Sequence, residues 1–299
     1  MQFAVLRNLA LKILDSIWLV KDFRPSVELE KRKNTLEYYL PRIRDDGERA
    51  EVLLELGRLE CHLGNTVQAA GRYHECLRLF RKVKDRLGIG RTLYCIALLH
   101  LERGNMEKAE ETLKECLQFA EECRNQWLTA SCYSTMARLY FERGEYDKAI
   151  EMSLEAFDLF SETGDADGMG RTLQNACISL MKQGNVEKTV ELLKNIRETW
   201  RGTNEENFIL ATLQLAAIHM SAGNVGEAEK LMEEIGDVQT VRISALANLL
   251  KALIYSTKGE KNEAMRLAEE AKKELKKAGM KPNIATEVLN AIRYLSSNP

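Results

Sequence analysis

Apolar residues recur every three or four positions along almost the whole chain, a spacing that places them on one face of a helix. Near the N-terminus the pattern predicts a helix over residues 4–21 and a turn over residues 22–25. A second helix is expected over residues 26–44, with a kink at Pro41 because proline cannot donate a helical hydrogen bond. Leu, Ala, Glu, Lys and Arg dominate the composition, which also favours helix. The pattern therefore predicts an all-α protein.

A glycine recurs in phase with this helical pattern and divides the middle of the chain into pairs of helices. The first four of these glycines are spaced by 40 residues, and two more follow at intervals of 39 and 36. Glycine readily adopts the left-handed backbone conformation that ends a helix, so each one marks the turn between the two helices of a pair. The six turn glycines are Gly64, Gly104, Gly144, Gly184, Gly223 and Gly259.

Two columns of small residues accompany the turn glycines. A small residue in either column lets two antiparallel helices approach closely, because a large side chain would force the backbones apart. Seven residues before the turn stand Gly57, Ala97, Ala137, Cys177, Ala216 and Ala252, and five residues after it stand Ala69, Ala109, Ala149, Thr189, Ala228 and Ala264.

The ends of the second helices carry their own signals. An asparagine directly follows four of the turn glycines, and asparagine is a preferred residue at a helix N-cap. We therefore expect Asn65, Asn105, Asn185 and Asn224 to cap the second helices. In the fifth pair the helical pattern stops near Gly236, so the second helix of that pair should be short.

In these columns the chain resembles the tetratricopeptide repeat, whose pattern is W-x2-L-G-x2-Y, then Gly, then A-x3-F. Leu56 with Gly57 matches the L-G pair, Tyr140 matches the tyrosine of the first helix, and Tyr73 matches the aromatic residue of the second helix. The resemblance covers residues 50–278. The chain lacks the proline at the repeat ends, and its repeats are longer than the common form of about 34 residues. They are similar to the longer repeats of Rap-type regulators, kinesin light chain and LGN-like adaptors.

The resemblance implies a right-handed α-α superhelix of about six helix pairs. Residues 1–47 are expected to form a degenerate N-terminal helix pair that caps the array, and residues 48–278 the array itself. Residues 279–299 are expected to supply a turn and a capping helix over residues 283–295. No linker or low-complexity segment separates these parts, so we expect one solenoid.

Composition and charge narrow the function. The 299 residues are 45% apolar and 29% charged with a formal net charge of −2, so no basic field draws the protein to nucleic acid or to an anionic membrane. The apolar run near the N-terminus is interrupted by Arg7, Lys12 and Asp15 and leaves no membrane span. The seven cysteines are odd in number and form no C-x-x-C pair, so we interpret them as reduced packing residues of a cytoplasmic protein.

The sequence contains no recognisable catalytic constellation. The four histidines do not have the spacing of metal ligands, and H-E-x-x-H, a phosphate-binding loop and a nucleophile elbow are all missing. The G-x-G sequences at Gly88 and Gly168 have no strand before them and fit turns between repeats better than phosphate cradles. We therefore expect a protein that is not an enzyme and that uses no metal or other cofactor.

The resemblance also implies that the first helix of each pair lines a groove on the inner face, where such proteins hold a peptide or helix of a partner. The matching positions of this chain include four arginines on one concave surface. Arginine makes charge-assisted, often bidentate contacts with carboxylates, so we expect a protein or peptide partner that is acidic. The expected groove residues are Arg58, Arg91, Tyr94, Arg138, Phe141, Arg171, Gln174, Asn175 and Gln214.

A competing interpretation assigns the arginines to ordinary ion pairs along their own helices. Arg138 has Glu142 four residues later, and Arg58 has Glu55 three residues earlier. Each such pair contributes only about 0.3–0.5 kcal/mol. The sequence leaves both interpretations open.

The sixth pair differs from the others because its inner positions are leucines. Exposed in a groove, they would form an apolar contact patch, and association into a homodimer would be its natural use. Alternatively, the C-terminal helix folds over them. The four leucines are Leu246, Leu249, Leu250 and Leu253.

The function predicted from these observations is that of a non-catalytic scaffold or adaptor for protein–protein interaction. The alternative is a peptide-sensing regulator of the Rap type, in which a bound peptide changes the shape of the superhelix. Such regulators carry an additional N-terminal helical bundle, and residues 1–47 are short for one.

Overall fold

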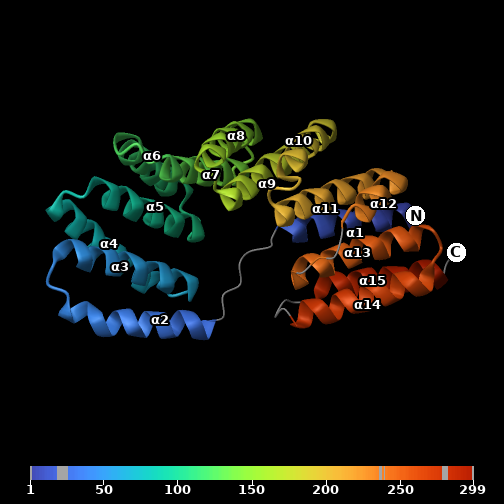
Figure 1. The fold of residues 1–299 in the computed structure, drawn as a ribbon, viewed down its shortest axis with the longest axis horizontal. Helices are drawn as coiled ribbons and strands as arrows, with labels where there is room; N and C mark the ends of the chain where they lie inside the picture. Colours follow the sequence, from blue (N-terminus) through green and yellow to red (C-terminus); the bar gives the residue numbers. More distant parts are fainter. Residues whose placement is uncertain (1, 19–25, 236–237, 239, 278–281, 298–299) are drawn as a thin grey trace. The chain divides into compact units, whose positions relative to one another are not determined.

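A computed structural model describes residues 2–18, 26–235, 238, 240–277 and 282–297 of the chain (Figure 1). The described residues form fifteen α-helices and one short 3-10 helix, and they contain no strand. The all-α fold expected from the sequence is therefore confirmed. The helices are α1 (Gln2–Trp18), α2 (Ser26–Tyr39), η1 (Leu40–Arg42), α3 (Asp46–His62), α4 (Thr66–Val83), α5 (Arg86–Glu102), α6 (Met106–Glu122), α7 (Gln126–Glu142), α8 (Tyr146–Thr163), α9 (Ala166–Lys182), α10 (Val186–Trp200), α11 (Glu205–Ala222), α12 (Val225–Glu233), α13 (Val241–Thr257), α14 (Lys261–Lys277) and α15 (Asn283–Ser297).

The helices group into two compact units, which are described separately. The first, called here the α2–α9 unit, comprises Asp22–Gln183. The second, the α1/α10–α15 unit, combines Met1–Lys21 with Gly184–Pro299. The second unit is therefore built from both ends of the chain.

In the α2–α9 unit, each helix packs on the next one in the chain from α2 and α3 through α8 and α9. The first helices of consecutive pairs also contact one another, α3 with α5, α5 with α7 and α7 with α9. The first helices thus share one face of the unit, and this face is called here the inner face. The second helices α4, α6 and α8 lie on the other side (Figure 1).

The turn glycines have the predicted backbone conformation. The φ angles at the six turns lie between 72° and 85°, in the left-handed region. Every residue of the second small column is 0% exposed, as are the five members of the first column that carry a side chain. At Gly57 an added Cβ would lie 2.3 Å from the ring of Tyr73, so this contact between α3 and α4 requires glycine.

The predicted capping asparagines do not cap through their side chains. Asn65 has φ −84° and ψ 58°, outside the extended conformation typical of an N-cap, and its amide donates to Glu60 at 2.7 Å. The other three also lack a side-chain cap bond. Side-chain caps instead begin the first helices, where the oxygens accept from the N–H three residues later at 2.8–3.0 Å. These caps are Asp45, Asp85, Asn125, Asp165 and Asn204.

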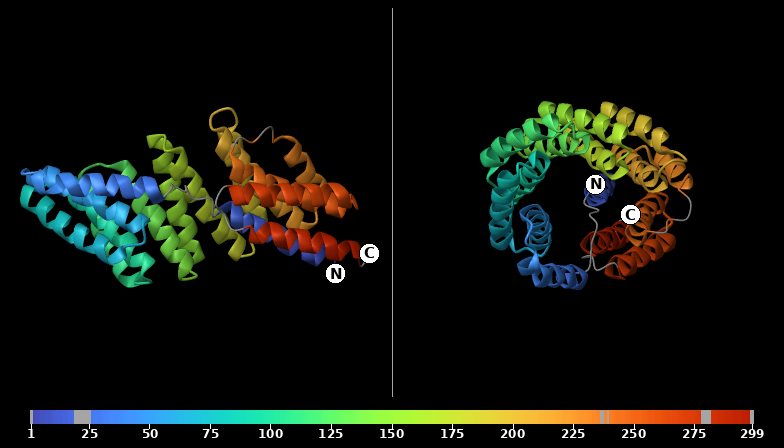
Figure 2. Two further views of the ribbon diagram at one scale, coloured as in Figure 1. Left: turned by 90° about the horizontal axis from the view of Figure 1, so that it is seen from below. Right: turned by 60° about the vertical axis from the view of Figure 1, so that its left-hand side comes forward.

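The α1/α10–α15 unit contains a tertiary contact that local pattern did not predict. Residues 4–21 were expected to pair with residues 26–44, but α1 packs against α11, α13 and α15 (Figure 2). The buried face of α1 consists of Leu6, Leu9, Ala10 and Ile13, each at most 5% exposed. Sequence composition explains the preference, since α2 reads SVELEKRKNTLEYY and has no apolar stripe, whereas α11 and α13 are apolar on most sides.

The C-terminal elements follow the pattern of the sequence. The second helix of the fifth pair, α12, spans only nine residues, and α15 begins at Asn283 and packs on α14 and α13. Gly236, where α12 was expected to stop, and residues 279–281 lie outside the described residues. None of the described helices has the length and apolar character needed to cross a bilayer.

Candidate functional site

The inner face of the α2–α9 unit carries most of the predicted groove residues. Arg58 lies on α3, Tyr94 on α5, Arg138 and Phe141 on α7, and Arg171 on α9. Arg58 and Arg171 are exposed, and the other three are half-buried. The first helices that contact one another along this face therefore bring these side chains onto one surface.

Arg91, also on this face, is neutralised within the unit. Its Nη1 and Nη2 donate to Oε1 and Oε2 of Glu51 at 2.8 and 3.1 Å, a bidentate ion pair between α5 and α3. Its groove position in the sequence predicted that Arg91 contacts the carboxylates of an acidic partner. The pair with Glu51 corrects that expectation, because a paired guanidinium attracts a ligand carboxylate less strongly.

Arg58 and Arg171 remain available. Glu55, the expected partner of Arg58, pairs instead with Arg32 of α2 at 2.8 Å. Among the described residues, no carboxylate lies within 4.0 Å of Arg58 or Arg171. The guanidinium of Arg171 lies 6.0 Å from the centre of the Phe160 ring. Two unpaired positive charges thus stand on the inner face.

Arg138 is only weakly paired with a carboxylate of its own helix. Its Nε lies 3.6 Å from Oε1 of Glu142, as the competing interpretation predicted. The same Nε is buried and has no hydrogen-bond partner among the described residues. This distance is too long for a good hydrogen bond, so the Arg138 guanidinium keeps donor capacity for a ligand.

Polar groove residues also connect neighbouring first helices. The hydroxyl of Thr135 on α7 donates to Tyr94 Oη on α5 at 3.2 Å, and the amide of Asn175 on α9 donates to the Ser134 carbonyl at 3.4 Å. Burial raises the pKa of Tyr94 above its ordinary value, so the phenol stays neutral at physiological pH. Asn175 and Tyr94 therefore fix the spacing of the first helices.

Gln174 lies beside Asn175 on α9 and is half-buried. The other predicted site residues, Gln214 and the four leucines, lie in the α1/α10–α15 unit and are covered. Gln214 is 7% exposed, and its Oε1 has no hydrogen-bond partner among the described residues. The four leucines of α13 are at most 2% exposed, so they form no open patch. Both α1 and α15 pack on α13. The four leucines are therefore part of the interior of this unit and form no exposed apolar surface. The predicted homodimer has no contact surface at this position.

Chemistry in the described residues is limited. No group of three or more His, Cys, Asp and Glu side chains among them could hold a metal ion. Burial raises the pKa of Cys76 to about 12 and of Cys95 to about 11, so both thiols stay protonated and unreactive at neutral pH. Neither of these two thiols is therefore an activated nucleophile.

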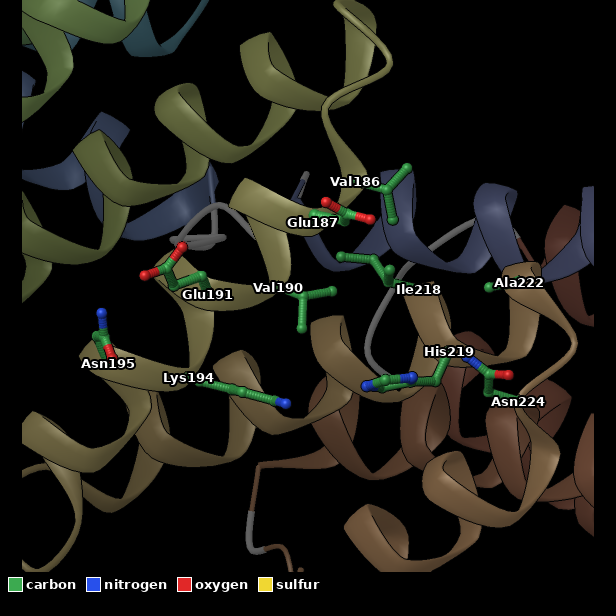
Figure 3. A pocket seen from close by; sticks show the side chains of 10 residues that line it. All are labelled: Val186, Glu187, Val190, Glu191, Lys194, Asn195, Ile218, His219, Ala222 and Asn224. Carbon is green, nitrogen blue, oxygen red and sulfur yellow. The ribbon is translucent and has the colours of Figure 1, made fainter.

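A second surface feature, which the sequence analysis missed, lies between α10 and α11. A cavity of about 440 Å³ is lined by residues of both helices and by Asn224, and Lys194 and His219 extend toward each other across it (Figure 3). Val190 and Ile218 form its apolar wall, and Glu187 stands at its edge. Burial is the main cause of a lowered pKa for His219, and the charge of Lys194 lowers it further.

Two family models match the chain. The tetratricopeptide repeat model matches residues 48–122 and 89–162, and the model for anaphase-promoting complex subunit 5 matches residues 139–257. Together the tetratricopeptide matches span α3 to α8, which include Arg58, Arg91 and Arg138, and they end before α9 with Arg171. Among curated proteins, none matches the chain.

Solved structures with a similar fold are numerous. A tetratricopeptide repeat protein from Parabacteroides merdae is 16% identical with a TM-score of 0.56, over 98% of this chain and 99% of that one. Aspartyl phosphate phosphatase F from Bacillus subtilis is 14% identical with a TM-score of 0.57, over 99% and 94%. A Rap protein in complex with competence and sporulation factor is 16% identical with a TM-score of 0.55, over 90% and 73%. At these identities the likeness concerns the fold.

Proposed function

This chain is a tetratricopeptide repeat protein, and from that premise we propose that the inner face of its α2–α9 unit binds an acidic peptide or helix of a partner protein. The protein acts in this proposal as a non-catalytic interaction scaffold. Its ligand lies along α3, α5, α7 and α9.

The observation that carries the proposal is a contrast between equivalent positions of the repeats. Six residues before the turn, Arg58 is exposed and Arg138 and Ile178 are half-buried in the α2–α9 unit. The matching residues of the other unit, Ala217 and Leu253, are both 0% exposed. In that unit the chain's own helix α1 packs on α11 and α13. In the α1/α10–α15 unit the first helices are thus covered by a helix, whereas in the α2–α9 unit the equivalent positions are more exposed.

Charge favours an acidic occupant. Arg58 and Arg171 are exposed without a carboxylate partner among the described residues, and Arg138 keeps a buried, unsatisfied Nε. Charge-assisted hydrogen bonds from guanidinium to carboxylate are roughly twice as strong as neutral ones. Tyr94 on α5 and Phe141 on α7 are half-buried and supply apolar contact on the same face. A partner with carboxylates on either side of an apolar residue fits this arrangement.

The likeness to a Rap protein solved with competence and sporulation factor favours a second candidate. In this alternative a peptide bound on the inner face changes the shape of the superhelix and thereby regulates another protein. Small-angle scattering with and without a bound peptide separates the two, since a scaffold keeps its radius of gyration and a Rap-type regulator changes it.

The setting of this function is proposed to be the cytoplasm. The seven cysteines are all free thiols, and five of them are buried. Unpaired, buried thiols are typical of proteins from a reducing compartment.

The test compares binding of defined peptides by fluorescence anisotropy. The probes are a fluorescein-labelled peptide that alternates glutamate with leucine and its counterpart with glutamine in place of glutamate. We expect the intact chain to prefer the acidic peptide, and the Arg58→Glu, Arg171→Glu double variant to bind it at least tenfold more weakly, because two attractions become repulsions.

A matched control reverses a charge elsewhere in the same unit. Arg78 is exposed on the second helix α4, so Arg78→Glu changes the net charge without touching the inner face. Equal loss of binding in the control would mean that only the overall charge matters. Equal affinity of the intact chain for both peptides would overturn the acidic assignment.

A further inference from the structure

The cavity between α10 and α11 marks a place where the repeat departs from its own pattern. At four of the other five turn glycines, the residue directly before the glycine is long and polar, and it reaches back to the preceding second helix. At the α10/α11 junction this residue is Ala222, which is too short to do so.

The neighbouring junctions show what normally fills the space. Arg103 Nη2 donates to the Thr66 carbonyl at 2.9 Å, and Gln183 Nε2 donates to Asp147 at 2.7 Å. The pattern continues with Arg143, which pairs with Glu107 at 3.7 Å and also with Glu110, and with Lys258, which pairs with Glu229.

The acceptor of this pattern is still present on α10. Glu187 stands three residues after its turn glycine, as Glu107 and Asp147 do after theirs. Glu107 pairs with Arg143, and Asp147 accepts a hydrogen bond from Gln183. The exposed carboxylate of Glu187 has no described basic group within 4.0 Å. The repeat therefore keeps the carboxylate and lacks the side chain that would neutralise it.

We propose that the α10/α11 cavity binds an arginine side chain of a partner peptide, which takes the place that Arg143 occupies at the α6/α7 junction. Its guanidinium meets Glu187, and its aliphatic stem lies against Val190 and Ile218 beside Ala222. This site is distinct from the inner face of the α2–α9 unit, so neither proposal depends on the other.

Size and charge of the cavity suit this ligand. A volume of about 440 Å³ is at the lower end of the range for small-ligand sites, about 300–1,000 Å³, so it takes one long side chain with part of its backbone. The lining carries the two carboxylates of Glu187 and Glu191 against the single ammonium of Lys194. His219 stays neutral at pH 7 because burial lowers its pKa, so it does not repel a cation.

The experiment uses the full chain with methyl-labelled isoleucine and valine, followed by NMR. The probe is a short alanine-glycine peptide with one central arginine, and the matched probe carries citrulline, which has the same shape without the charge. We expect saturable shifts at Ile218 and Val190, with the arginine peptide at least tenfold tighter than the citrulline peptide.

Three variants complete the test. Glu187→Gln should weaken the arginine peptide about tenfold, and Ala222→Arg should abolish the shifts at Ile218 because the chain then fills its own cavity. Glu233→Gln, which removes an exposed carboxylate of α12 outside the cavity, should change nothing. If Ala222→Arg fails to fold, Glu187→Gln and the citrulline peptide still decide. Equal affinity for both peptides, or unchanged binding in Glu187→Gln, would overturn the proposal.

Discussion

The bidentate pair between Arg91 and Glu51 joins the same position of two consecutive repeats, 40 residues apart in sequence. Both side chains are more than one-third exposed, with 37% and 46% of their surface accessible. Pairs in such solvent contact contribute about 0–1 kcal/mol. The pair therefore affects the charge of the inner face more than it affects the free energy of unfolding.

The first prediction separates these two roles. Arg91→Glu should lower the free energy of unfolding by about 1 kcal/mol or less, because it replaces an exposed attraction by a repulsion. The swapped double variant Glu51→Arg, Arg91→Glu should recover the loss. Urea denaturation at low and high salt measures both, and the loss should shrink at high salt. A loss of several kcal/mol that the swap leaves in place would show that Arg91 has a packing role instead.

The close contact between α3 and α4 leads to a second prediction. Gly57→Ala places a Cβ 2.3 Å from Cε1 and 2.6 Å from Cδ1 of Tyr73, so the buried ring must shift. We expect a loss of about 1–3 kcal/mol, the cost of overpacking a core. Gly71 on α4 is the matched control, since an added Cβ there meets nothing within 4 Å. Gly71→Ala should raise stability by about 0.5–1 kcal/mol. Thermal unfolding distinguishes the two, and a neutral Gly57→Ala would contradict the packing described here.

The docking of α1 on α11, α13 and α15 supports a third prediction. Ile13 is 0% exposed, so Ile13→Ala removes buried apolar surface and leaves a cavity. The expected cost is about 2–5 kcal/mol, with faster amide hydrogen exchange in α11 and α13. Arg7→Ala alters an exposed position of the same helix and should leave exchange unchanged. Unchanged exchange in Ile13→Ala would mean that α1 contributes little to the unit.

The helix pairs could be predicted from the sequence because each pair depends on residues that lie close together in the chain. Each turn glycine ends a helix through its own backbone conformation, and each small residue meets a helix that is near in the chain. The two columns that include Ala97 and Ala69 therefore identified the helix pairs, and both residues are fully buried. The short helix α12 was also predicted from local sequence, because the helical pattern of the fifth pair stops early.

Contacts between segments that are far apart in the chain could not be predicted from the local pattern of apolar residues. The periodicity of residues 4–21 shows that α1 has an apolar face, but not that α11 and α13 cover it. Likewise, Arg91 and Glu51 stand in one column, yet their pairing depends on the spacing between α5 and α3. The cavity beside Ala222 reflects a missing side chain, which becomes visible only when the neighbouring junctions supply the comparison.

A fourth prediction concerns Glu110, which joins α6 to α7. Its carboxylate accepts from Lys114 and Arg143, with the Lys114 nitrogen 2.8 Å away, and Tyr140 Oη donates to it at 3.3 Å. Hydrogen bonding with Lys114 is the main cause that lowers the pKa of Glu110 to about 2, and Arg143 adds to it. Because the folded pKa lies below the ordinary value of 4.5, the ionised carboxylate stabilises the fold above about pH 4.5, and this contribution is lost as pH falls toward 2.

Glu110→Gln should therefore destabilise the protein at pH 7 by about 1 kcal/mol, the upper range for a solvent-screened pair. The difference from the unmodified chain should narrow steadily between pH 4.5 and pH 2, the window set by the ordinary and the folded pKa of this carboxyl. Glu111→Gln removes the neighbouring, exposed carboxylate of α6 and should show no such narrowing. Urea unfolding midpoints measured at several pH values check this directly. A difference between Glu110→Gln and the unmodified chain that stays constant over this window would mean that hydrogen bonding to Tyr140, and not the charge of Glu110, holds α6 to α7.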